Sequence, residues 1–227
     1  MKRARYICLE GTEGVGKTTQ TQNLYDYIRS KGYSVLLTKE PGTPHAPLTM
    51  TLRGLMLDAQ YDTQLTRPSR EFLSQAIRSI HLEHVIVPGL SKYDFIIQDR
   101  GILSGYAYGE ACGNEHVFLK QIAASVVDAA STVDPNYTFN PVTERLYDQV
   151  VYLRGDSKKG LARAASSKQE FAAGDAIEAK GNSFMLQVQK NMDAHSRLFN
   201  TCTIEVDNKT IDEVHQDILQ ALELKDI

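Results

Sequence analysis

The sequence is poor in cysteine, in net charge and in long apolar runs. Its three cysteines, Cys8, Cys112 and Cys202, are too few and too scattered for a disulfide framework or a zinc cluster. The formal net charge is only −3, which argues against a binder of nucleic acid polymers or a protein held at a membrane surface. No apolar run approaches ~18 residues, so the sequence predicts neither a signal peptide nor a membrane span. We therefore expect a protein of a reducing, cytoplasmic compartment.

What the sequence does contain is an alternation of two patterns. Short apolar runs typical of buried strands alternate with stretches of helical periodicity. We expect strands at 6–9, 33–38, 95–97, 150–153 and 202–206. We expect helices at 18–29, 48–57, 70–90, from 104, at 116–130, 183–199 and 211–222. Among the 227 residues, 42% are apolar, enough for a sizeable core. The pattern predicts an α/β fold of three layers, with a five-stranded parallel sheet covered by helices on both faces.

Two stretches differ from this pattern. Residues 131–141 contain Asp134-Pro135 and Asn140-Pro141, which are typical of a loop. Residues 157–180 are rich in Lys, Ala, Ser and Gly and have few large apolar side chains, so we expect them to be helical in part and mobile. Because there is no internal repeat and no linker, residues 1–227 are expected to form a single domain.

A phosphate-binding motif follows the first expected strand. Residues 11–18, GTEGVGKT, satisfy G-x-x-x-x-G-K-[ST] at every position. The glycines let successive backbone N–H groups surround phosphate oxygens, and the helix N-terminus that follows adds a favourable dipole. Lys17 would hold the charge of a transferred phosphoryl group, and the Thr18 hydroxyl would bind Mg²⁺. The motif predicts a P-loop for ATP made of Glu13, Gly14, Val15, Gly16, Lys17, Thr18 and Thr19.

A P-loop alone does not distinguish kinases, ATPases and switches. Residues 14–19 are also similar to those of ParA-type partition ATPases. Those proteins carry an additional lysine near the start of the loop, where this chain has Thr12. A ParA-like ATPase switch therefore remains an alternative.

Beyond the P-loop, four segments resemble thymidylate kinases, in that family's order. Residues 38–44, TKEPGTP, resemble its R-E-P-G-G-T-P loop, with lysine for arginine and one glycine missing. Residues 71–84 resemble the helix that offers an arginine to the thymine base. Residues 99–109 resemble D-R-Y-x-x-S-x-x-A-Y, and residues 204–218 resemble the final strand, adenine-side loop and last helix. The resemblance spans nearly the whole chain, and only residues 113–144 have no counterpart.

The resemblance implies a nucleoside monophosphate kinase. Such an enzyme uses ATP and Mg²⁺ to phosphorylate a deoxynucleoside monophosphate, above all dTMP to dTDP. The resemblance also implies a homodimer and a lid, here at about 157–182. In the family the lid supplies an arginine when the P-loop has none. Gly160-Leu161-Ala162-Arg163 fits that pattern, so Arg163 is our candidate for stabilising transition-state charge. Lys158, Lys159 and Lys168 are able to share this role, and an ordinary solvated charge is the alternative for Arg163.

Three further positions complete the expected ATP-binding side of the site. Arg100 follows an apolar strand that ends beside the P-loop, where a permanently charged guanidinium can bind phosphate oxygens. Asp99 would orient metal-bound water, so Thr18 and Asp99 are the expected metal site. A surface salt bridge is the alternative for Arg100. By resemblance, Asn208 belongs to the adenine-side loop.

Three residues of the expected acceptor site are supported by a physical argument. Arg53, in the helix after the 40–42 loop, would bind the acceptor phosphate, although a solvated helix charge explains it almost as well. Arg78 lies among apolar positions of a helix, so its guanidinium needs a partner, which in the family is a base carbonyl. Tyr108 would crowd a ribose 2′-hydroxyl and favour deoxynucleotides, or is core packing. The other acceptor-site candidates are Glu40, Pro41, Phe72, Ser74, Gln75, Ser104 and Gly105.

Three departures from the family pattern bear on the substrate. Gly101 replaces the tyrosine of D-R-Y and would open space near the acceptor phosphate, and Ala176 replaces the arginine of the lid's D-R-I-E. Ser74 stands where the family stacks a phenylalanine on thymine. Because Ser74 and Gln75 make a more polar pocket than a methyl group requires, a modified pyrimidine such as 5-hydroxymethyl-dUMP, or another deoxynucleotide, is the alternative to dTMP. An inactive binding protein is a further alternative, indicated by Gly101 and Ala176.

Overall fold

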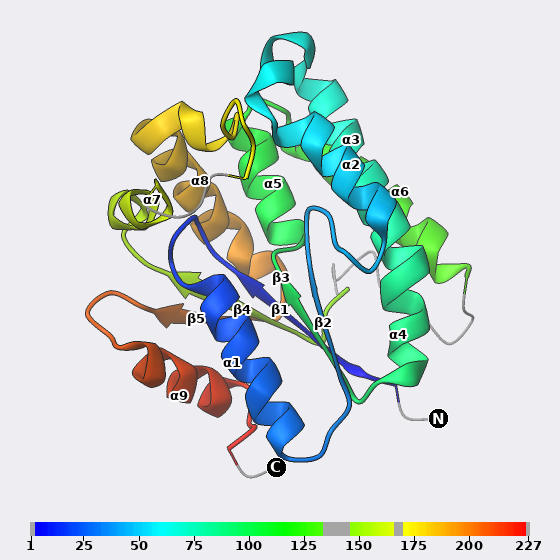
Figure 1. Cartoon of the computed structure of the whole chain (residues 1–227), viewed down its shortest axis with the longest axis vertical. Helices are drawn as coiled ribbons and strands as arrows, with labels where there is room; N and C mark the ends of the chain where they lie inside the picture. Colours follow the sequence, from blue (N-terminus) through cyan, green and yellow to red (C-terminus); the bar gives the residue numbers. More distant parts are fainter. Residues whose placement is uncertain (1–2, 134–145, 166–169, 226–227) are drawn as a thin grey trace.

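The computed structural model describes residues 3–133, 146–165 and 170–225. At its centre lies a five-stranded sheet in the order β2-β3-β1-β4-β5, and every neighbouring pair of strands is parallel. The strands are β1 (Arg5–Glu10), β2 (Val35–Lys39), β3 (Phe95–Asp99), β4 (Gln149–Arg154) and β5 (Thr201–Glu205). Helices lie on both faces of this sheet, as Figure 1 shows. The predicted α/β fold with a five-stranded parallel sheet is confirmed.

The helices divide between the two faces of the sheet. On one face α1 and α9 pack against the strands, and on the other lie α4, α5, α6 and α8 (Figure 1). The α-helices are α1 (Lys17–Ser30), α2 (Pro47–Leu57), α3 (Arg67–His81), α4 (Val87–Lys92), α5 (Ile102–Ala111), α6 (His116–Ser131), α7 (Ser157–Ala165), α8 (Gly181–His195) and α9 (Ile211–Ala221). Shorter helical turns are η1 (Ala59–Gln64), η2 (Leu82–Ile86), η3 (Glu178–Lys180) and η4 (Ser196–Leu198).

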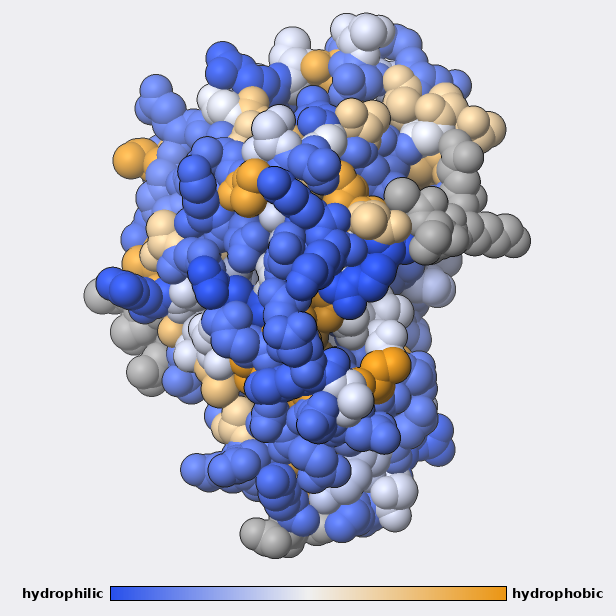
Figure 2. Space-filling view, turned by 90° about the vertical axis from the view of Figure 1, so that its left-hand side faces the viewer, coloured by the Kyte–Doolittle hydropathy of each residue, from blue (hydrophilic) through white to orange (hydrophobic). Residues whose placement is uncertain are grey.

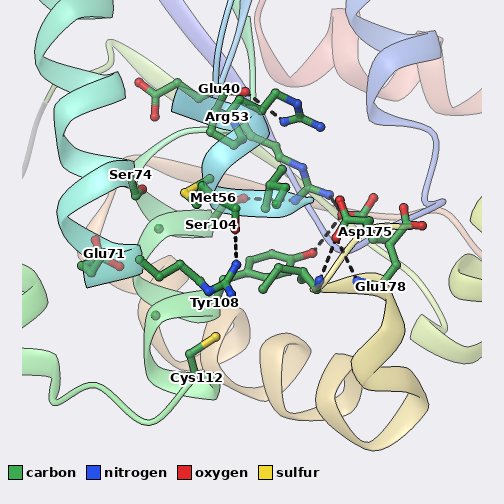
Figure 3. Close-up of a pocket in the computed structure, with 18 of the residues that line it drawn as sticks. Glu40, Arg53, Met56, Glu71, Ser74, Ser104, Tyr108, Cys112, Asp175 and Glu178 are labelled. Carbon is green, nitrogen blue, oxygen red and sulfur yellow. Dashed lines mark hydrogen bonds and ion pairs between the residues drawn. The ribbon is translucent and has the colours of Figure 1, made fainter. Parts of the chain in front are cut away.

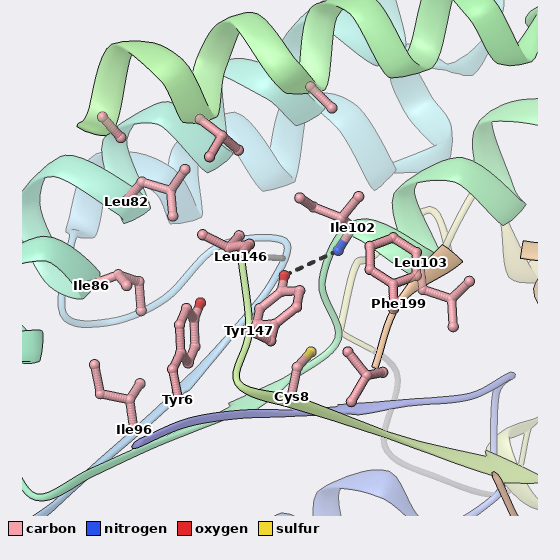
Figure 4. Close-up of a cluster of buried hydrophobic side chains, with 14 of the residues drawn as sticks. Tyr6, Cys8, Leu82, Ile86, Ile96, Ile102, Leu103, Leu146, Tyr147 and Phe199 are labelled. Atoms are coloured by element: carbon pink, nitrogen blue, oxygen red, sulfur yellow. Dashed lines mark hydrogen bonds between the residues drawn. The ribbon is translucent and has the colours of Figure 1, made fainter. Parts of the chain in front are cut away.

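The alternation of side chains along β1 builds a core on each face. Tyr6 and Cys8 point into the cluster with α4, α5 and α6, whereas Ile7 and Leu9 point into the cluster with α1 and α9. Figure 4 shows the first cluster, where the ring of Tyr147 meets that of Tyr6 edge-on with centroids 4.9 Å apart. Because both faces of the central strands are buried, β1, β3 and β4 each contain a continuous apolar run.

The expected single helix over 70–90 was wrong at its start and in its interior. The helix begins earlier, because the Thr66 side chain accepts a hydrogen bond from the backbone N–H of Ser69 and so caps α3 at Arg67. It also changes form at Leu82, where a wider π-helical turn, η2, precedes α4. Pro88 explains this break, because proline has no backbone N–H and its ring collides with the carbonyl one turn before it.

The remaining differences are at element ends and in connections. The helix expected from Ser104 begins at Ile102, and the helical turn η1 was not predicted. The expected loop at 131–141 lies outside the described residues from 134 onward. In the stretch expected to be partly helical, α7 covers Ser157–Ala165. None of the described helices is both long and apolar enough to cross a membrane. The face that carries α7 and α9 is mainly hydrophilic, with scattered apolar side chains (Figure 2).

Candidate active site

The P-loop connects β1 to α1 and folds around its own lysine. The Nζ of Lys17 donates a hydrogen bond of 2.6 Å to the carbonyl of Thr12, and the side chain is buried. Gly14 and Gly16 both have left-handed backbone angles, with φ of 66° and 97°. Burial, together with the nearby charge of Arg100, lowers the pKa of Lys17 to about 8, although Glu13 and Asp99 oppose this. The loop therefore holds a buried cation whose charge lacks full compensation.

Neighbouring strands bring a hydroxyl and a carboxylate together beside this loop. Leu9 of β1 pairs with Asp99 at the end of β3, so Asp99 lies next to the start of the P-loop. The Thr18 hydroxyl donates a hydrogen bond of 2.7 Å to Oδ2 of Asp99. The other oxygen, Oδ1, is buried and has no hydrogen-bond partner within the described ranges 3–133, 146–165 and 170–225. This oxygen is free to accept a further ligand.

Arg100 is held over the P-loop by groups on three sides. Its guanidinium donates to Glu13 Oε1 at 2.6 Å and to the carbonyl of Gly11 at 3.0 Å. The guanidinium carbon lies 5.3 Å from the ring centre of Tyr108, whose hydroxyl also donates to Glu13 Oε1 at 3.3 Å. Burial favours a raised pKa for Glu13, but the charges of Arg100 and Lys17 outweigh it and lower the pKa to about 2. Glu13 thus stays ionised and positions Arg100.

A buried carboxylate attaches α5 to the P-loop strand. Glu10, the last residue of β1, accepts hydrogen bonds from both the backbone N–H and the hydroxyl of Ser104. Burial raises the pKa of Glu10, while the bonds from Ser104 and the charge of Arg100 lower it less. Ser104 therefore fixes the first turn of α5 beside the phosphate site.

One cavity of about 620 Å³ extends from the P-loop into the space between α2, α3 and α5. Thr18, Asp99 and Arg100 line it at the phosphate end. Ser74, which is labelled in Figure 3, lines it on α3. Asp175 and Glu178, from the segment that follows residues 166–169, also line it. The cavity therefore joins the phosphate loop to a second, deeper compartment.

Buried charges form the floor of the deeper compartment. Arg78 donates to Glu40 Oε2 through Nε at 3.1 Å and through Nη2 at 2.9 Å. Nδ1 of His81 lies 3.2 Å from Glu40 Oε1, and its Nε2 lies 2.8 Å from the hydroxyl of Thr38. Burial alone would raise the pKa of Glu40, but Arg78 and His81 outweigh it and lower the pKa. The network holds the guanidinium of Arg78 in place, with its Nη1 buried and unpartnered among the described residues.

Arg53 reaches the cavity from α2. Its Nη1 donates to the carbonyl of Pro41 at 2.9 Å, and Nε and Nη2 each donate to Glu170 at 2.8 Å. This paired contact with a carboxylate has the geometry that a phosphate also accepts. The hydrogen bond from Arg53 also lowers the pKa of Glu170, and partial burial opposes it.

The helix α7 lies against the P-loop through two glycines. A Cβ on Gly14 would come within 1.9 Å of the carbonyl oxygen of Gly160, so only glycine fits there. Arg163 is exposed on the same helix, and its Nε donates to the carbonyl of Lys159 at 3.3 Å. Lys168 lies outside the described residues. Asn208 occupies the turn after β5 with φ of 63°.

The structure brings most of the sequence candidates into this one cavity. Nine candidates do not line it, and five of these are the P-loop residues Gly14, Val15, Gly16, Lys17 and Thr19. Phe72 is 55% exposed and meets Phe118 edge-on, Gln75 is buried and donates to Glu71, and Arg163 and Asn208 lie outside. The candidates that line it are Glu13, Thr18, Glu40, Pro41, Arg53, Ser74, Arg78, Asp99, Arg100, Ser104, Gly105 and Tyr108.

The expectation that Gly101 opens space was wrong, because the volume that a side chain at this position would occupy is already filled. A Cβ there would come within 2.0 Å of the Tyr147 hydroxyl, so Tyr147 fills that volume. That hydroxyl accepts a hydrogen bond from the backbone N–H of Ile102 at 3.2 Å, drawn in Figure 4. Tyr147 comes from a distant part of the chain, so no local sequence pattern around Gly101 predicts this contact.

Several cavity residues were missed by the sequence analysis. Glu71 is the most informative, because it precedes Ser74 by three positions and Arg78 by seven, so a helix places all three on one face. That spacing was a usable signal. The others include Lys39, Arg67, Arg70, Cys112, Asn114, Glu170, Asp175 and Glu178.

The fold and the site together define the class of protein to which this chain belongs. A parallel sheet, a P-loop with a buried lysine, and an adjoining cavity with arginines at both ends form a P-loop protein that holds nucleotide phosphates.

Comparison with known proteins defines the family. Residues 9–218 match the thymidylate kinase family. A thymidylate kinase of Acholeplasma laidlawii is 29% identical over 215 residues, which is 94% of this chain and 96% of that protein. One of Acinetobacter baylyi is 40% identical over 103 residues, 45% of this chain, and the match spans only 50% of that relative's length. The crystal structure of thymidylate kinase from Ehrlichia chaffeensis shares the fold, with a TM-score of 0.67, 23% identity and coverage of 97% and 99%.

The chain belongs to the thymidylate kinase family. Its homologues indicate an enzyme of the nucleoside monophosphate kinase class, a phosphotransferase.

Proposed function

We propose that this protein transfers the terminal phosphoryl group of ATP to a deoxynucleoside monophosphate, the class of acceptor to which dTMP belongs. The observation that carries the proposal is the continuity of the cavity. It runs from Thr18 and Arg100 at the P-loop to Arg78 and Ser74 on α3. A transfer between two nucleotides requires a continuous cavity of this kind, in which their phosphates can face one another.

The phosphate end supplies charge rather than a nucleophile. Lys17 and Arg100 neutralise negative charge on the transferred group, and Arg163 joins them from α7. Glu13 holds Arg100 in position through the bond of 2.6 Å. Thr18 and Asp99 would hold Mg²⁺, because a hydroxyl and a carboxylate with an unpartnered buried oxygen are the hard oxygen ligands that this ion prefers. When bound, Mg²⁺ supplies further neutralisation of phosphate charge.

The deeper compartment receives the acceptor. Arg53 binds the acceptor phosphate, which takes the place of the Glu170 carboxylate. Tyr108 lies against the sugar, and the buried Nη1 of Arg78 donates to a carbonyl of the base. The segment around Asp175 and Glu178 closes over the cavity and limits the access of water to the transferred group.

The test is an assay of ADP release with ATP and Mg²⁺ in the presence and absence of each deoxynucleoside monophosphate. We expect ADP release to require an acceptor, and the Lys17→Ala variant to lose at least about 100-fold in kcat, because an electrostatic contact to the transferred group is removed. Release that is independent of an acceptor would instead indicate an ATPase switch. A fully active Lys17→Ala variant would also contradict the proposal.

We also propose that the protein is a homodimer that pairs through α2, α3 and α6. The helix α3 contacts both α2 and α6, and the three helices carry large exposed apolar side chains: Leu48 at 59%, Leu55 at 40%, Phe72 at 55% and Val117 at 62%. Apolar side chains that gather on adjoining helices are typical of a protein interface.

A further inference from the structure

The deep end of the cavity contains a carboxylate and a guanidinium from the same helix face. Glu71, Ser74 and Arg78 are spaced at three and four positions along α3, and all three line the cavity. Glu71 and Ser74 are labelled on this helix in Figure 3. Both charged side chains are almost fully buried, with 6% of Glu71 and 2% of Arg78 exposed. A ligand that enters this end therefore meets an acceptor and a donor side by side.

The facing helix α5 approaches both charged groups closely through two glycines. A Cβ on Gly105 of α5 would lie 3.0 Å from Arg78 Nη2, and a Cβ on Gly109 would lie 3.2 Å from Glu71 Oε2. These two glycines are one helical turn apart, so α5 presents bare backbone to both charged groups. Ser74, which lies between the two charged residues on α3, adds only a small side chain to this end of the cavity.

Neither charged group is fully partnered. Nη1 of Arg78 is buried and has no hydrogen-bond partner in the part of the chain that the structure describes. Within the same residues, the only hydrogen bond to the Glu71 carboxylate comes from its neighbour Gln75, at 2.8 Å to Oε1. The nearest cations on α3 are engaged elsewhere, since Arg67 donates to the carbonyl of Gly113 and Arg70 binds Asp62 at 2.5 Å.

The electrostatic state of Glu71 agrees with this geometry. Burial raises the pKa of Glu71, and the bond from Gln75 and the charge of Arg78 only partly offset it. A ligand N–H or O–H beside Oε2 would supply the missing hydrogen bond. A ligand without such a donor would instead remove water from the carboxylate and supply no hydrogen bond in its place, which is unfavourable.

We propose that Glu71 selects the base, and that this kinase prefers deoxynucleoside monophosphates whose base carries an exocyclic N–H or O–H donor over dTMP. The inference rests on the proposed kinase function and names its substrate class. Arg78 can donate a hydrogen bond to any base that offers a carbonyl oxygen, so it does not discriminate between such bases. The exocyclic donor is an amino group or a hydroxymethyl group, and both make the same hydrogen bond to Glu71.

Thymine fits this pair poorly for two reasons. Its exocyclic methyl group donates no hydrogen bond. Its ring N–H lies between two carbonyl oxygens, so a carboxylate that approaches it also faces their lone pairs. A hydrogen bond between a donor and an ionised carboxylate is worth on the order of 10- to 100-fold in affinity. We therefore expect a preference of this size in kcat/KM for a base with an exocyclic donor.

The experiment compares kcat/KM for dTMP, dUMP, 5-hydroxymethyl-dUMP, dCMP and dGMP, with ATP and Mg²⁺, in the wild type and in Glu71→Val. We expect at least one of the last three acceptors to exceed dTMP by about tenfold or more in the wild type. In Glu71→Val that preference should disappear, because valine cannot accept the hydrogen bond. The identity of the preferred acceptor separates the amino group from the hydroxymethyl group. A preference for dTMP in the wild type, or a preference that survives in Glu71→Val, would overturn the inference.

Two controls keep the outcomes distinct. Glu115→Val removes an exposed carboxylate at the start of α6, outside the cavity, and should retain the wild-type preference. Calorimetric measurement of ATP binding to Glu71→Val reports whether that variant is folded. The Glu71→Gln variant keeps the shape of the side chain, and it should show a reduced preference for acceptors with an exocyclic donor. If no monophosphate is phosphorylated by the wild type, the proposed function itself fails. If dTMP is phosphorylated best, the proposed function stands and only the role of Glu71 is lost.

Discussion

Lys17 has a charge that depends on pH close to neutrality. In the ligand-free protein its pKa is lowered from 10.5 to about 8, first by burial and then by Arg100. We therefore expect the affinity for ATP to fall as pH rises through about 8, because a neutral amine does not attract phosphate oxygens. Calorimetric titration of the protein with ATP and Mg²⁺ on both sides of this pH measures the effect.

The same pKa determines how Lys17 affects folding. The unfolded chain binds this proton more tightly than the folded one, so stability rises with pH between about 8 and 10.5. Lys17→Met is the control, because methionine has similar length and no charge. It should bind ATP weakly at every pH and should lack this rise in the free energy of unfolding. If wild type and variant show the same pH dependence, the titrating group is not Lys17.

Individual site residues could be predicted from the sequence where their chemistry is local. Lys17 and Thr18 belong to one continuous motif, and Asp99 and Arg100 follow a strand that must end beside it. Glu71 and Phe72 show the limit of this reasoning. Both lie on the same helix, but only packing against α5 and α6 decides that Glu71 faces the cavity and Phe72 faces Phe118. The local sequence contains no signal of such long-range packing.

Among elements, the contact between α7 and the P-loop depends on two glycines. In Gly14→Ala the new Cβ would overlap the Gly160 carbonyl, which lies 1.9 Å from it, and backbone cannot move aside as a flexible side chain can. We expect α7 to be displaced and kcat to fall about 100-fold, since a shift of ~1 Å at a reacting site has an effect of that size. Steady-state assays with saturating ATP and acceptor measure it.

Gly32→Ala provides the matched control for strain. Gly32 also has a left-handed backbone, with φ of 88°, but a Cβ there would have nothing within 4 Å. Both variants place alanine in the left-handed region, at a similar cost of about 1 kcal/mol. Only Gly14→Ala adds a collision with α7. Equal losses of kcat in the two variants would show that backbone strain, not the position of α7, is responsible.

The elements themselves were predictable to different degrees. Strands such as 150–153 stood out because a strand buried on both faces is a continuous apolar run. The helix at 70–90 was harder, because its periodicity continues through Pro88 although its hydrogen bonds do not. Its cap at Thr66 was a local signal that the apolar pattern concealed. Periodicity locates an element, whereas capping and proline determine where it ends.

For the whole molecule, the main prediction concerns the proposed dimer. Phe72 is 55% exposed at the contact between α3 and α6, where its ring meets Phe118 with centroids 5.9 Å apart. In Phe72→Glu, pairing would bury an unpartnered carboxylate, at a cost of about 3–5 kcal/mol, or on the order of 100-fold or more in the dimer dissociation constant. We expect the wild type to be dimeric and Phe72→Glu monomeric in size-exclusion chromatography with light scattering.

Ile211→Glu separates this effect from that of an added charge. Ile211 is 58% exposed, close to the value for Phe72, but it begins α9, which covers the opposite face of the sheet. A carboxylate in the first turn of a helix is also favourable, so this variant should fold well. We expect Ile211→Glu to remain dimeric. If both variants dissociate, added negative charge rather than the loss of Phe72 separates the subunits, and if neither does, the subunits pair through another surface.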